Sequence, residues 1–384
     1  MNARSAETMH VIIIGSAGGQ DTLDSLRQDL PETGIVPLSC PDPGSLVHVL
    51  RPLSAGTRVL LLRAGDRVEP GYLASLAQHG SGDAVGTLLT PTVTIRPDGA
   101  RDDRLQWRFK HGSRSADLTA EPYIFPDTIS GVVLTVPRRG MSDWGGLGPL
   151  RGIEDTDGAN GSDENAGLSG LIAHIVDTGN RVGLHDGPAV VHHAPSPPGA
   201  WGKIEHYRHL LGTLLPAWLQ ADSPPPAWVY QLVIHRLIQV TEADRGLRFP
   251  SARLTVAERA EVAQLLRSVT RHVPAAQIEA YCSTPLAVGR RTALTALAAG
   301  PMPAPILPSA RRFRSDQKAT YFFTGALPAE QWKVDGSWAS PTSAKTVDHR
   351  YFDEVVLHER IVWLPKGEIT AVINGQELPV APYR

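Results

Sequence analysis

Three short segments of the sequence carry side chains that could bind a charged ligand. The first is the turn Arg63-Ala64-Gly65-Asp66, which directly follows the aliphatic residues 59–62. The guanidinium of Arg63 could hold phosphate groups, and the carboxylate of Asp66 could hold a divalent cation. Aspartate is also a residue type that caps a following helix. The residue types alone therefore leave both a ligand-binding role and a capping role open for Asp66.

The other two segments lie further along the chain. Asp163 and Glu164 directly precede the helical run 165–176, and His192 and His193 end a short strand-like run. Histidine can complete a metal or phosphate shell. The acidic pair can instead be the N-terminal acids that the dipole of a helix favours. A rival acidic pair at residues 154–155 lies in a longer Asp- and Gly-rich loop and fits the spacing less well.

Two further positions could contact a sugar. Asp127 and Ser130 precede the strand-like run 131–136, where they could hydrogen-bond a sugar or simply form a turn. Trp338 lies beside the hairpin-forming dipeptide Asp335-Gly336 and is the tryptophan best placed to stack on a sugar. The other tryptophans are expected in the core, because large aromatic side chains dominate core packing.

The first half of the chain alternates between strand-like and helical runs. Such alternation is typical of an α/β domain with a largely parallel sheet. After residue 200 the pattern becomes helical, and Thr255 and Glu258 have the spacing of a capping box. From about residue 311 it becomes β, with hairpin dipeptides at Asp335-Gly336 and Asn374-Gly375. We therefore expect an α/β domain at 1–200, a helical segment at 201–305 and a small β-sandwich at 311–384.

Residues 58–73, RVLLLRAGDRVEPGYL, resemble the central signature of family 2 glycosyltransferases, whose fold is of the GT-A type. In that family a buried strand ends in an Asp-x-Asp-Asp-like turn, and a helix begins near a proline shortly afterwards. The resemblance implies that acidic residues there hold Mn²⁺ or Mg²⁺, which bridges the diphosphate of a nucleotide-sugar. Here Arg63 and Gly65 replace the two metal carboxylates, and only Asp66 remains. The resemblance thus implies a weak cation site, with Arg63 offered to the diphosphate.

Residues 161–172 and 190–193 resemble the acceptor half of the same fold. The resemblance implies that Asp163 or Glu164 is the general base, which deprotonates the acceptor hydroxyl for in-line attack on the anomeric carbon. Such a reaction is an inverting transfer of a hexosyl group. The resemblance also places Asp127 and Ser130 beside the acceptor. His192 and His193 are then candidates to join Asp66 as metal ligands.

The helical residues 201–300 and the runs 330–336, 345–352 and 357–365 resemble the front part of large actinobacterial proteins. In those proteins a family 2 glycosyltransferase-like region precedes a CDP-glycerol glycerophosphotransferase domain for teichoic-acid-type polymers. The resemblance implies work on a cell-wall glycopolymer, with a nucleotide-sugar donor and a glycan or polyol-phosphate acceptor. It also implies a partner transferase and oligomer formation through the β tail.

Two functions from different classes fit these residues. The first is an active glycosyltransferase, which the acidic pair Asp163-Glu164 and the pair His192-His193 favour. The second is a catalytically degenerate GT-A fold that binds a glycan or a partner transferase as an accessory protein. The replacement of the family's carboxylates by Arg63 and Gly65 favours this second function.

The composition narrows the class of protein. Of its residues, 42% are hydrophobic and 20% are charged, a balance typical of globular proteins. Its length of 384 residues exceeds that of one ordinary domain and indicates more than one. A net charge of −2 without a basic stripe gives no electrostatic support for nucleic-acid binding. Two distant cysteines, Cys40 and Cys282, indicate a reducing compartment, and no run has the length of a signal peptide or membrane span. We expect a cytoplasmic protein that can associate peripherally with the inner face of the membrane.

Overall fold

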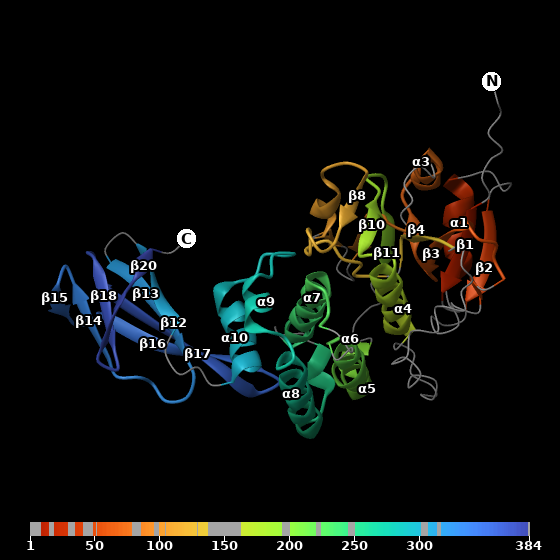
Figure 1. The fold of residues 1–384 in the computed structure, drawn as a ribbon. Helices are drawn as coiled ribbons and strands as arrows, with labels where there is room; N and C mark the ends of the chain where they lie inside the picture. The colour runs from red at the N-terminus through yellow and green to blue at the C-terminus, as the bar shows by residue number, and fades with distance from the viewer. Residues whose placement is uncertain are drawn as a thin grey trace. The chain divides into compact units, whose positions relative to one another are not determined.

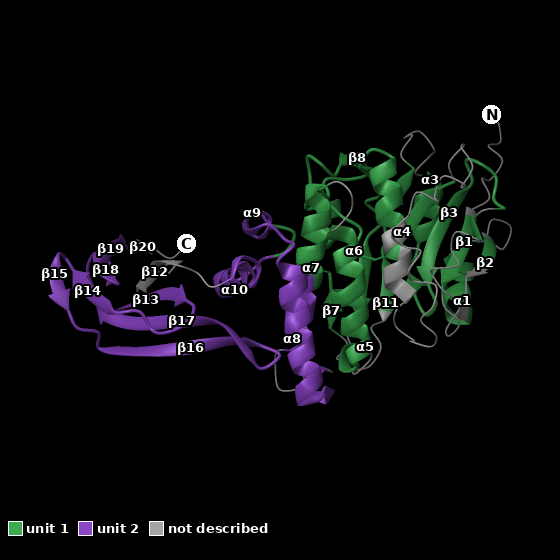
Figure 2. Cartoon of the chain, turned by 60° about the horizontal axis from the view of Figure 1, so that its bottom comes forward, with its two compact units in different colours: residues 1–236, 282–284 green, residues 237–281, 285–384 purple. Residues whose placement is uncertain are grey.

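The structure is a computed structural model of the chain. It describes residues 9–14, 19–29, 35–40, 49–50, 52–78, 86–95, 100–103, 105–128, 130–136, 163–193, 200–219, 224–244, 250–300, 306–312 and 316–382. The chain forms two compact units, shown in separate colours in Figure 2. Unit 1 comprises residues 1–236 and 282–284, and unit 2 comprises residues 237–281 and 285–384. The division at residues 200, 305 and 311 expected from the sequence stays a prediction.

Unit 1 is built on a seven-stranded mixed sheet. Its neighbouring strands β2, β1, β3, β9, β5, β10 and β8 follow one another in that order across the sheet. Strands β2, β1 and β3 are parallel to one another, whereas β9 is antiparallel to both of its neighbours. The bounds are β1 Met9–Ile14, β2 Ile35–Cys40, β3 Arg58–Arg63, β5 Thr87–Leu89, β8 Arg114–Asp117, β9 Val132–Thr135 and β10 Arg181–Leu184.

A second, smaller sheet in unit 1 brings distant segments together. It contains β4 (Arg67–Val68), β11 (Val190–His193), β6 (Thr92–Ile95) and β7 (Arg101–Asp102), in that order. Strand β11 is antiparallel to β4 and parallel to β6. The strand-like run expected at the two histidines therefore forms a strand that pairs with the residues just after the Arg63–Asp66 turn.

Helices α1 (Gly19–Asp29) and α3 (Tyr72–Gln78) lie beside β1 and β3 in Figure 1. Their apolar side chains join those of the two strands in one buried cluster, which includes Leu26, Tyr72 and Leu76 from the helices and Val11 and Leu60 from the strands. Strands β1 and β3 read as unbroken aliphatic runs because central parallel strands are covered on both faces. This core fixes the position of the turn that ends β3.

The remaining helices of unit 1 are α4 (Asp163–Asp177) and a helical group after residue 200. That group consists of η6 Ala200–Gly202, α5 Ile204–Tyr207, the π-helical turn η7 Arg208–Leu214, α6 Leu215–Leu219 and the first part of α7 Ala227–Ala243. The short 3-10 helix η3 (Gln106–Phe109) lies between β7 and β8 in the sequence. Among the described residues, no helix is both long enough and apolar enough to cross a membrane.

Unit 2 begins within α7 and contains three further helices and two sheets. The helices are α8 Val256–Thr270, α9 Ala275–Glu279 and α10 Val288–Ala299, with the short helix η8 Pro250–Arg253 before them. One sheet has the strand order β16-β17-β13-β12-β20 and the other the order β15-β14-β18-β19. The bounds are β12 Ile306–Arg312, β13 Asp316–Phe323, β14 Glu330–Val334, β15 Ser337–Ala339, β16 Ser343–Tyr351, β17 Glu354–Pro365, β18 Ile369–Ile373, β19 Gln376–Pro379 and β20 Ala381–Pro382.

The two sheets of unit 2 bury one core between them. Tyr321 and Val362 come from the first sheet, and Trp332 and Ala371 come from the second. Almost all strand pairs are antiparallel, the pair β12–β20 being parallel. The succession of an α/β sheet, helices and two mainly antiparallel sheets packed as a small β-sandwich is confirmed, but the large sheet is mixed rather than largely parallel.

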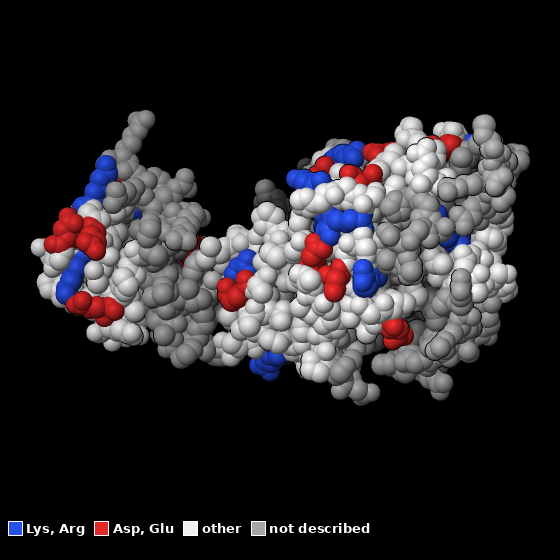
Figure 3. Space-filling view, turned by 45° about the horizontal axis from the view of Figure 1, so that its top comes forward, with Lys and Arg blue, Asp and Glu red and all other residues white. Residues whose placement is uncertain are grey.

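Charged side chains of both signs occur in each unit. On the face drawn in Figure 3, the basic and acidic side chains of the described residues lie interspersed. Several of them form ion pairs within a unit, such as Arg114 with Glu121 in unit 1 and Arg360 with Glu330 in unit 2. Ion pairs between exposed side chains contribute little to the free energy of unfolding. The side chains of Arg360 and Glu330 are largely buried, so their pair is not of the exposed kind.

Candidate functional site

The backbone of the turn Arg63–Asp66 is held in place by hydrogen bonds within the turn and with helix α1. The amide of Asp66 donates to the carbonyl oxygen of Arg63 at 3.0 Å. The hydroxyl of Thr22, in α1, accepts from the amide of Gly65 at 2.9 Å and donates to the carbonyl oxygen of Arg63 at 3.4 Å. Gly65 has a φ of +92°, a conformation that a residue without Cβ adopts most readily. The turn is therefore a defined structure rather than a loose connection.

The carboxylate of Asp66 points into the protein and is fully buried. Its Oδ2 accepts from the amide of Arg63 at 2.9 Å and from the hydroxyl of Ser130. Its Oδ1 is 2.7 Å from Nδ1 of His192, which donates, because an ionised carboxylate can only accept. Both oxygens of Asp66 thus have protein donors, as a buried charge requires.

Strand pairing explains why these residues meet. Strand β4 follows Asp66 directly and runs antiparallel to β11, with Val68 opposite Val190. This register brings His192 beside Asp66. Ser130 comes from a third segment. The amide of the next residue, Gly131, donates to the carbonyl oxygen of Leu61 in β3 at 2.9 Å, and this hydrogen bond holds the segment beside the end of β3.

Electrostatics keeps Asp66 ionised. Burial by itself would raise the pKa of this carboxyl group. The hydrogen bond from His192, the charge of Arg63 and the hydrogen bond from Ser130 act in the opposite direction and hold the pKa of Asp66 below its usual value of 3.8. Asp66 is therefore a buried anion whose charge fixes the orientation of three neighbours.

A chain of buried hydroxyl groups supports the same region. The phenol of Tyr72 lies 2.8 Å from the hydroxyl of Thr90, which donates to the carbonyl oxygen of Gly131 at 2.7 Å. Thr90 therefore accepts from Tyr72. Burial raises the pKa of Tyr72, so the phenol stays protonated and available as this donor. Gly131 has a φ of +77°, and a Cβ there would lie 2.7 Å from Oγ1 of Thr90.

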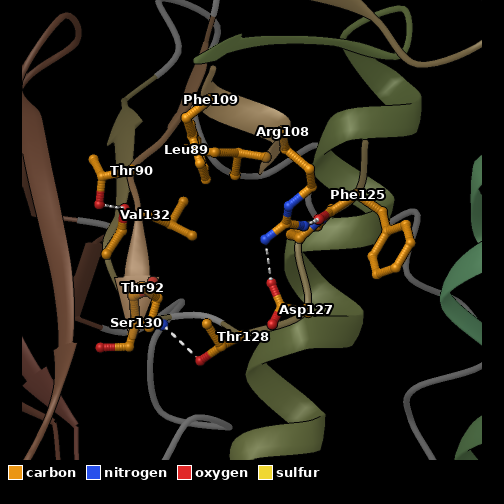
Figure 4. Close-up of a pocket in the computed structure, with 12 residues that line it drawn as sticks. Leu89, Thr90, Thr92, Arg108, Phe109, Phe125, Asp127, Thr128, Ser130 and Val132 are labelled. Carbon is orange, nitrogen blue, oxygen red and sulfur yellow. Dashed lines mark hydrogen bonds and ion pairs between the residues drawn. The ribbon is translucent and has the colours of Figure 1, made fainter. Parts of the chain in front are cut away.

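A small hollow with room for about one water molecule opens beside Ser130. Figure 4 shows the ion pair between Arg108 and Asp127 beside the hollow, which Thr92, Thr128 and Ser130 also line. The distance from Nη2 of Arg108 to Oδ1 of Asp127 is 2.8 Å. Burial would raise the pKa of Asp127, but the charge of Arg108 and further neighbouring cations hold it below its usual value. The polar side chains around the hollow are therefore bonded within the protein, and Asp127 is the carboxylate among them.

The predicted site residues fall into three groups. Arg63, Asp66, Ser130 and His192 lie together, and Asp127 lines the same hollow as Ser130. Trp338 belongs to unit 2, where its side chain is 63% exposed and Nζ of Lys333 lies 4.7 Å from its ring centroid. The side chains of three predicted residues lie outside the described part of the structure: Asp163 and Glu164, which open α4, and His193, which ends β11. The roles assigned to all these residues stay predictions.

Sequence reasoning missed Thr22 and Arg108. Thr22 is a buried threonine in an amphipathic helix, and its role depends on a turn 41 residues later in the sequence. Arg108 lies in the run Gln106–Phe109, where a charged residue between two aromatic residues could have indicated a buried ion pair. Nothing in the spacing of these residues names their partners.

The described residues do not fit a divalent cation. Mg²⁺ and Mn²⁺ need several oxygen or nitrogen ligands open on one side. Asp66 is fully buried, and donors from the protein engage both of its oxygens. Within the described ranges, no group of three or more His, Cys, Asp or Glu side chains is placed to hold a metal ion. Arg63 adds a positive charge, which repels a cation, next to the same carboxylate.

No family model and no curated protein matches this sequence. Among solved structures, S. aureus TarS 1-349 in complex with UDP-GlcNAc is similar with a TM-score of 0.47 and 13% identity, over 76% of this chain and 87% of that chain. A structure of S. aureus TarS is similar with a TM-score of 0.45 and 10% identity, over 98% of this chain and 78% of that chain. GalNAc-T7 with UDP, GalNAc and Mn²⁺ has a TM-score of 0.31 and 11% identity, over 68% of this chain and 55% of that chain.

Proposed function

We propose that unit 1 binds a nucleotide-sugar and acts as a glycosyltransferase. The observation that carries this proposal is the meeting of Asp66, Ser130 and His192 at one buried carboxylate. These residues come from three separate segments, and each segment resembles a part of the family 2 glycosyltransferase site. They meet at the end of β3, and ligands of open α/β sheets bind outside the carboxyl ends of the strands.

Within this proposal each residue has a role in binding or in proton transfer. Arg63 contacts the diphosphate of the donor, and Asp66 positions Arg63, Ser130 and His192 around it. Asp127 accepts a hydrogen bond from a hydroxyl group of the sugar, and the buried Ser130 acts beside it through its hydrogen bond to Asp66. Asp163 or Glu164 takes the proton from the acceptor hydroxyl, which attacks the anomeric carbon in line and inverts it.

The acceptor we propose is a glycan or polyol-phosphate chain of a cell-wall polymer of the teichoic-acid type, in an actinobacterial setting. In unit 2, Trp338 presents an exposed indole on which a sugar of such a polymer can stack. The β-sandwich also provides a surface for oligomer formation or for a partner transferase. The chain would act in the cytoplasm, at the inner face of the membrane.

A second function is favoured by a specific observation. Arg63 and Gly65 stand where the resembled family carries two metal carboxylates. A protein that lost catalysis but kept the fold would serve as an accessory protein that binds the glycan or a partner transferase. Activity measurements separate this function from the first.

The test uses the full chain with UDP, UDP-GlcNAc and CDP as probes, since the first two occur in the TarS structures. Calorimetric titration measures binding, and release of UDP in the presence of teichoic-acid-type polymer measures transfer. Asp163→Asn combined with Glu164→Gln should lower turnover by at least about 100-fold, because general-base catalysis contributes that much, while leaving binding unchanged.

Asp177→Asn is the matched control, because Asp177 is an exposed acid at the other end of α4. It should leave turnover unchanged. Nucleotide binding without turnover on any acceptor would favour the accessory function. Failure of all three probes to bind would contradict the glycosyltransferase function.

A further inference from the structure

The open side of the Arg63–Asp66 turn carries no carboxylate. Gly65 has no side chain, and a Cβ built there would meet nothing within 4 Å, so this position faces open space. Asp66, the one acidic residue of the turn, is fully buried. A cation approaching the turn from the open side would therefore find no acidic ligand among these four residues.

The carboxylate of Asp66 could not turn towards a cation without losing its donors. A bound Mg²⁺ requires oxygen atoms at about 2.0–2.1 Å in near-octahedral geometry. To reach one, Asp66 would have to release the Ser130 hydroxyl and the Arg63 amide from Oδ2, or His192 from Oδ1. Each released donor would then lie buried without its acceptor, which is unfavourable.

Arg63 supplies the positive charge that the turn otherwise lacks. It is the last residue of β3 and lies opposite Ile14, the last residue of β1, so it stands at the carboxyl edge of the sheet. Its side chain is 19% exposed, and its Nε lies 3.9 Å from Oδ2 of Asp66, beyond hydrogen-bond distance. Its backbone is fixed, because its amide donates to Asp66 and its carbonyl oxygen accepts from Thr22.

A guanidinium suits a diphosphate for physical reasons. It is charged at every pH a protein experiences, and its planar array of donors matches two phosphate oxygens at once. Because the side chain of Arg63 is only 19% exposed, it has fewer conformations to lose on binding than an exposed surface arginine would.

We propose that this site binds the diphosphate of a nucleotide without a divalent cation, with the guanidinium of Arg63 in the place of the metal ion. The proposal rests on the proposed function, since it concerns the same donor site. It replaces the metal role expected for Asp66 with a positioning role. The ligand class is a nucleoside diphosphate or its sugar ester.

The test is calorimetric titration of the full chain with UDP and CDP in three buffers, containing EDTA, Mg²⁺ or Mn²⁺. The expected result is a dissociation constant that differs by less than about threefold between the three buffers. Arg63→Ala should weaken binding by at least about tenfold in all three, the loss typical of a charged hydrogen bond. Arg63→Lys, which keeps the charge but not the planar donor array, should lie between Arg63→Ala and the wild type.

Arg67→Ala is the matched control, because it removes the same charge from an exposed neighbour on β4. It should change binding by less than about threefold, so that a larger loss in Arg63→Ala reflects position rather than net charge. Circular dichroism and the unfolding midpoint show whether each variant is folded.

A further variant tests whether nucleotide binding at this site can be made to depend on a metal ion. Arg63→Asp introduces a carboxylate where the resembled family has one, and it should abolish binding in EDTA and restore it in Mn²⁺. Binding by the wild type that depends on Mn²⁺ or Mg²⁺ by more than threefold would overturn the proposal and leave the transferase function standing. Equal losses in Arg63→Ala and Arg67→Ala would also overturn it. If neither nucleotide binds in any buffer, both the proposal and the proposed function fail.

Discussion

Asp66 shows how a buried charge is tolerated in a protein. Removing a carboxylate from water is unfavourable unless protein donors replace the lost hydration. Here the donors come from Arg63, Ser130 and His192, which belong to the turn, to the entry of β9 and to β11. The charge therefore stabilises the fold and holds three parts of the site together.

This arrangement predicts a specific effect of Asp66→Asn. An asparagine has only one acceptor oxygen, so at least one of the donors loses its partner. The free energy of unfolding at neutral pH should fall by about 3 kcal/mol, in the range measured for broken buried networks. Chemical denaturation measures this value. Asp24→Asn, at an exposed acid of α1, is the control and should change stability by less than about 0.5 kcal/mol.

The same residue predicts a pH dependence. The pKa of Asp66 in the folded protein lies below its usual value of 3.8. Its ionisation therefore stabilises the fold fully above that value, and this contribution is lost as pH falls through the lower folded pKa. As pH falls from about 4 through the folded pKa, the stability of the wild type should fall more steeply than that of Asp66→Asn. Parallel pH profiles of the two proteins would contradict the depressed pKa.

At the scale of single elements, the sequence predicted correctly those features whose interacting residues are close together in the chain. Thr255 and Glu258 form the expected capping box: the Thr255 hydroxyl accepts from the amide of Glu258 at 3.3 Å, and Glu258 accepts from the amide of Thr255 at 2.7 Å. The hairpin dipeptides Asp335-Gly336 and Asn374-Gly375 have positive φ at both residues, as two-residue hairpin turns of this kind require.

A third hairpin turn could not be expected from its residue types. Phe352 and Asp353 connect β16 to β17 with φ values of +50° and +66°. A bulky residue rarely adopts this conformation. Phe352 is buried, and its amide donates to Asp244 at 2.5 Å, while Asp353 pairs with Arg259 at 2.6 Å. Contacts from residues before and within α8 thus impose the turn.

Helix capping predicts two opposite changes in stability within unit 2. Thr255→Ala removes the cap of α8 and should lower the free energy of unfolding by about 1 kcal/mol, whereas Thr255→Ser should retain most of it. Helix α10 begins after Ala287, which is exposed, has extended backbone angles and has no side chain that can cap. Ala287→Ser should therefore raise stability by about 0.5–1 kcal/mol in the same denaturation assay. No gain in Ala287→Ser would mean that the backbone donors of α10 are already satisfied.

At the scale of the whole molecule, each unit has an apolar core of its own among the described residues. One surrounds Leu60 and Tyr72 in unit 1, and the other surrounds Tyr321 and Trp332 in unit 2. Units with their own cores generally unfold as separate cooperative transitions. The nucleotide site proposed here belongs entirely to unit 1.

Differential scanning calorimetry tests this separation. Asp66→Asn should lower the midpoint of one transition, and Trp332→Ala, which opens a cavity in the sandwich core, should lower the midpoint of the other by several degrees. UDP should raise the midpoint of the transition that Asp66→Asn lowers, because a ligand stabilises only the unit that binds it. A single transition shifted alike by both variants would show that the units unfold together.

The sequence by itself determined the elements of this protein and their order. Aliphatic runs, turn dipeptides and the capping box act over a few neighbouring residues, so their patterns could be read directly, and they predicted the α/β sheet, the helices and the β-sandwich. The sequence also singled out Arg63, Asp66, Ser130 and His192 as candidates. Their partners are separated by 64 and 126 residues, a distance over which no local pattern carries information.

Only the tertiary structure decided what those candidates do to one another. The pairing of β4 with β11 and the entry of β9 beside β3 turned Asp66 inward and surrounded it with donors. A residue that could have been a metal ligand or a helix cap is thus a buried anchor for its neighbours. The physical reason is that burial requires every lone pair of a charged group to be satisfied, and only the folded chain brings the donors together.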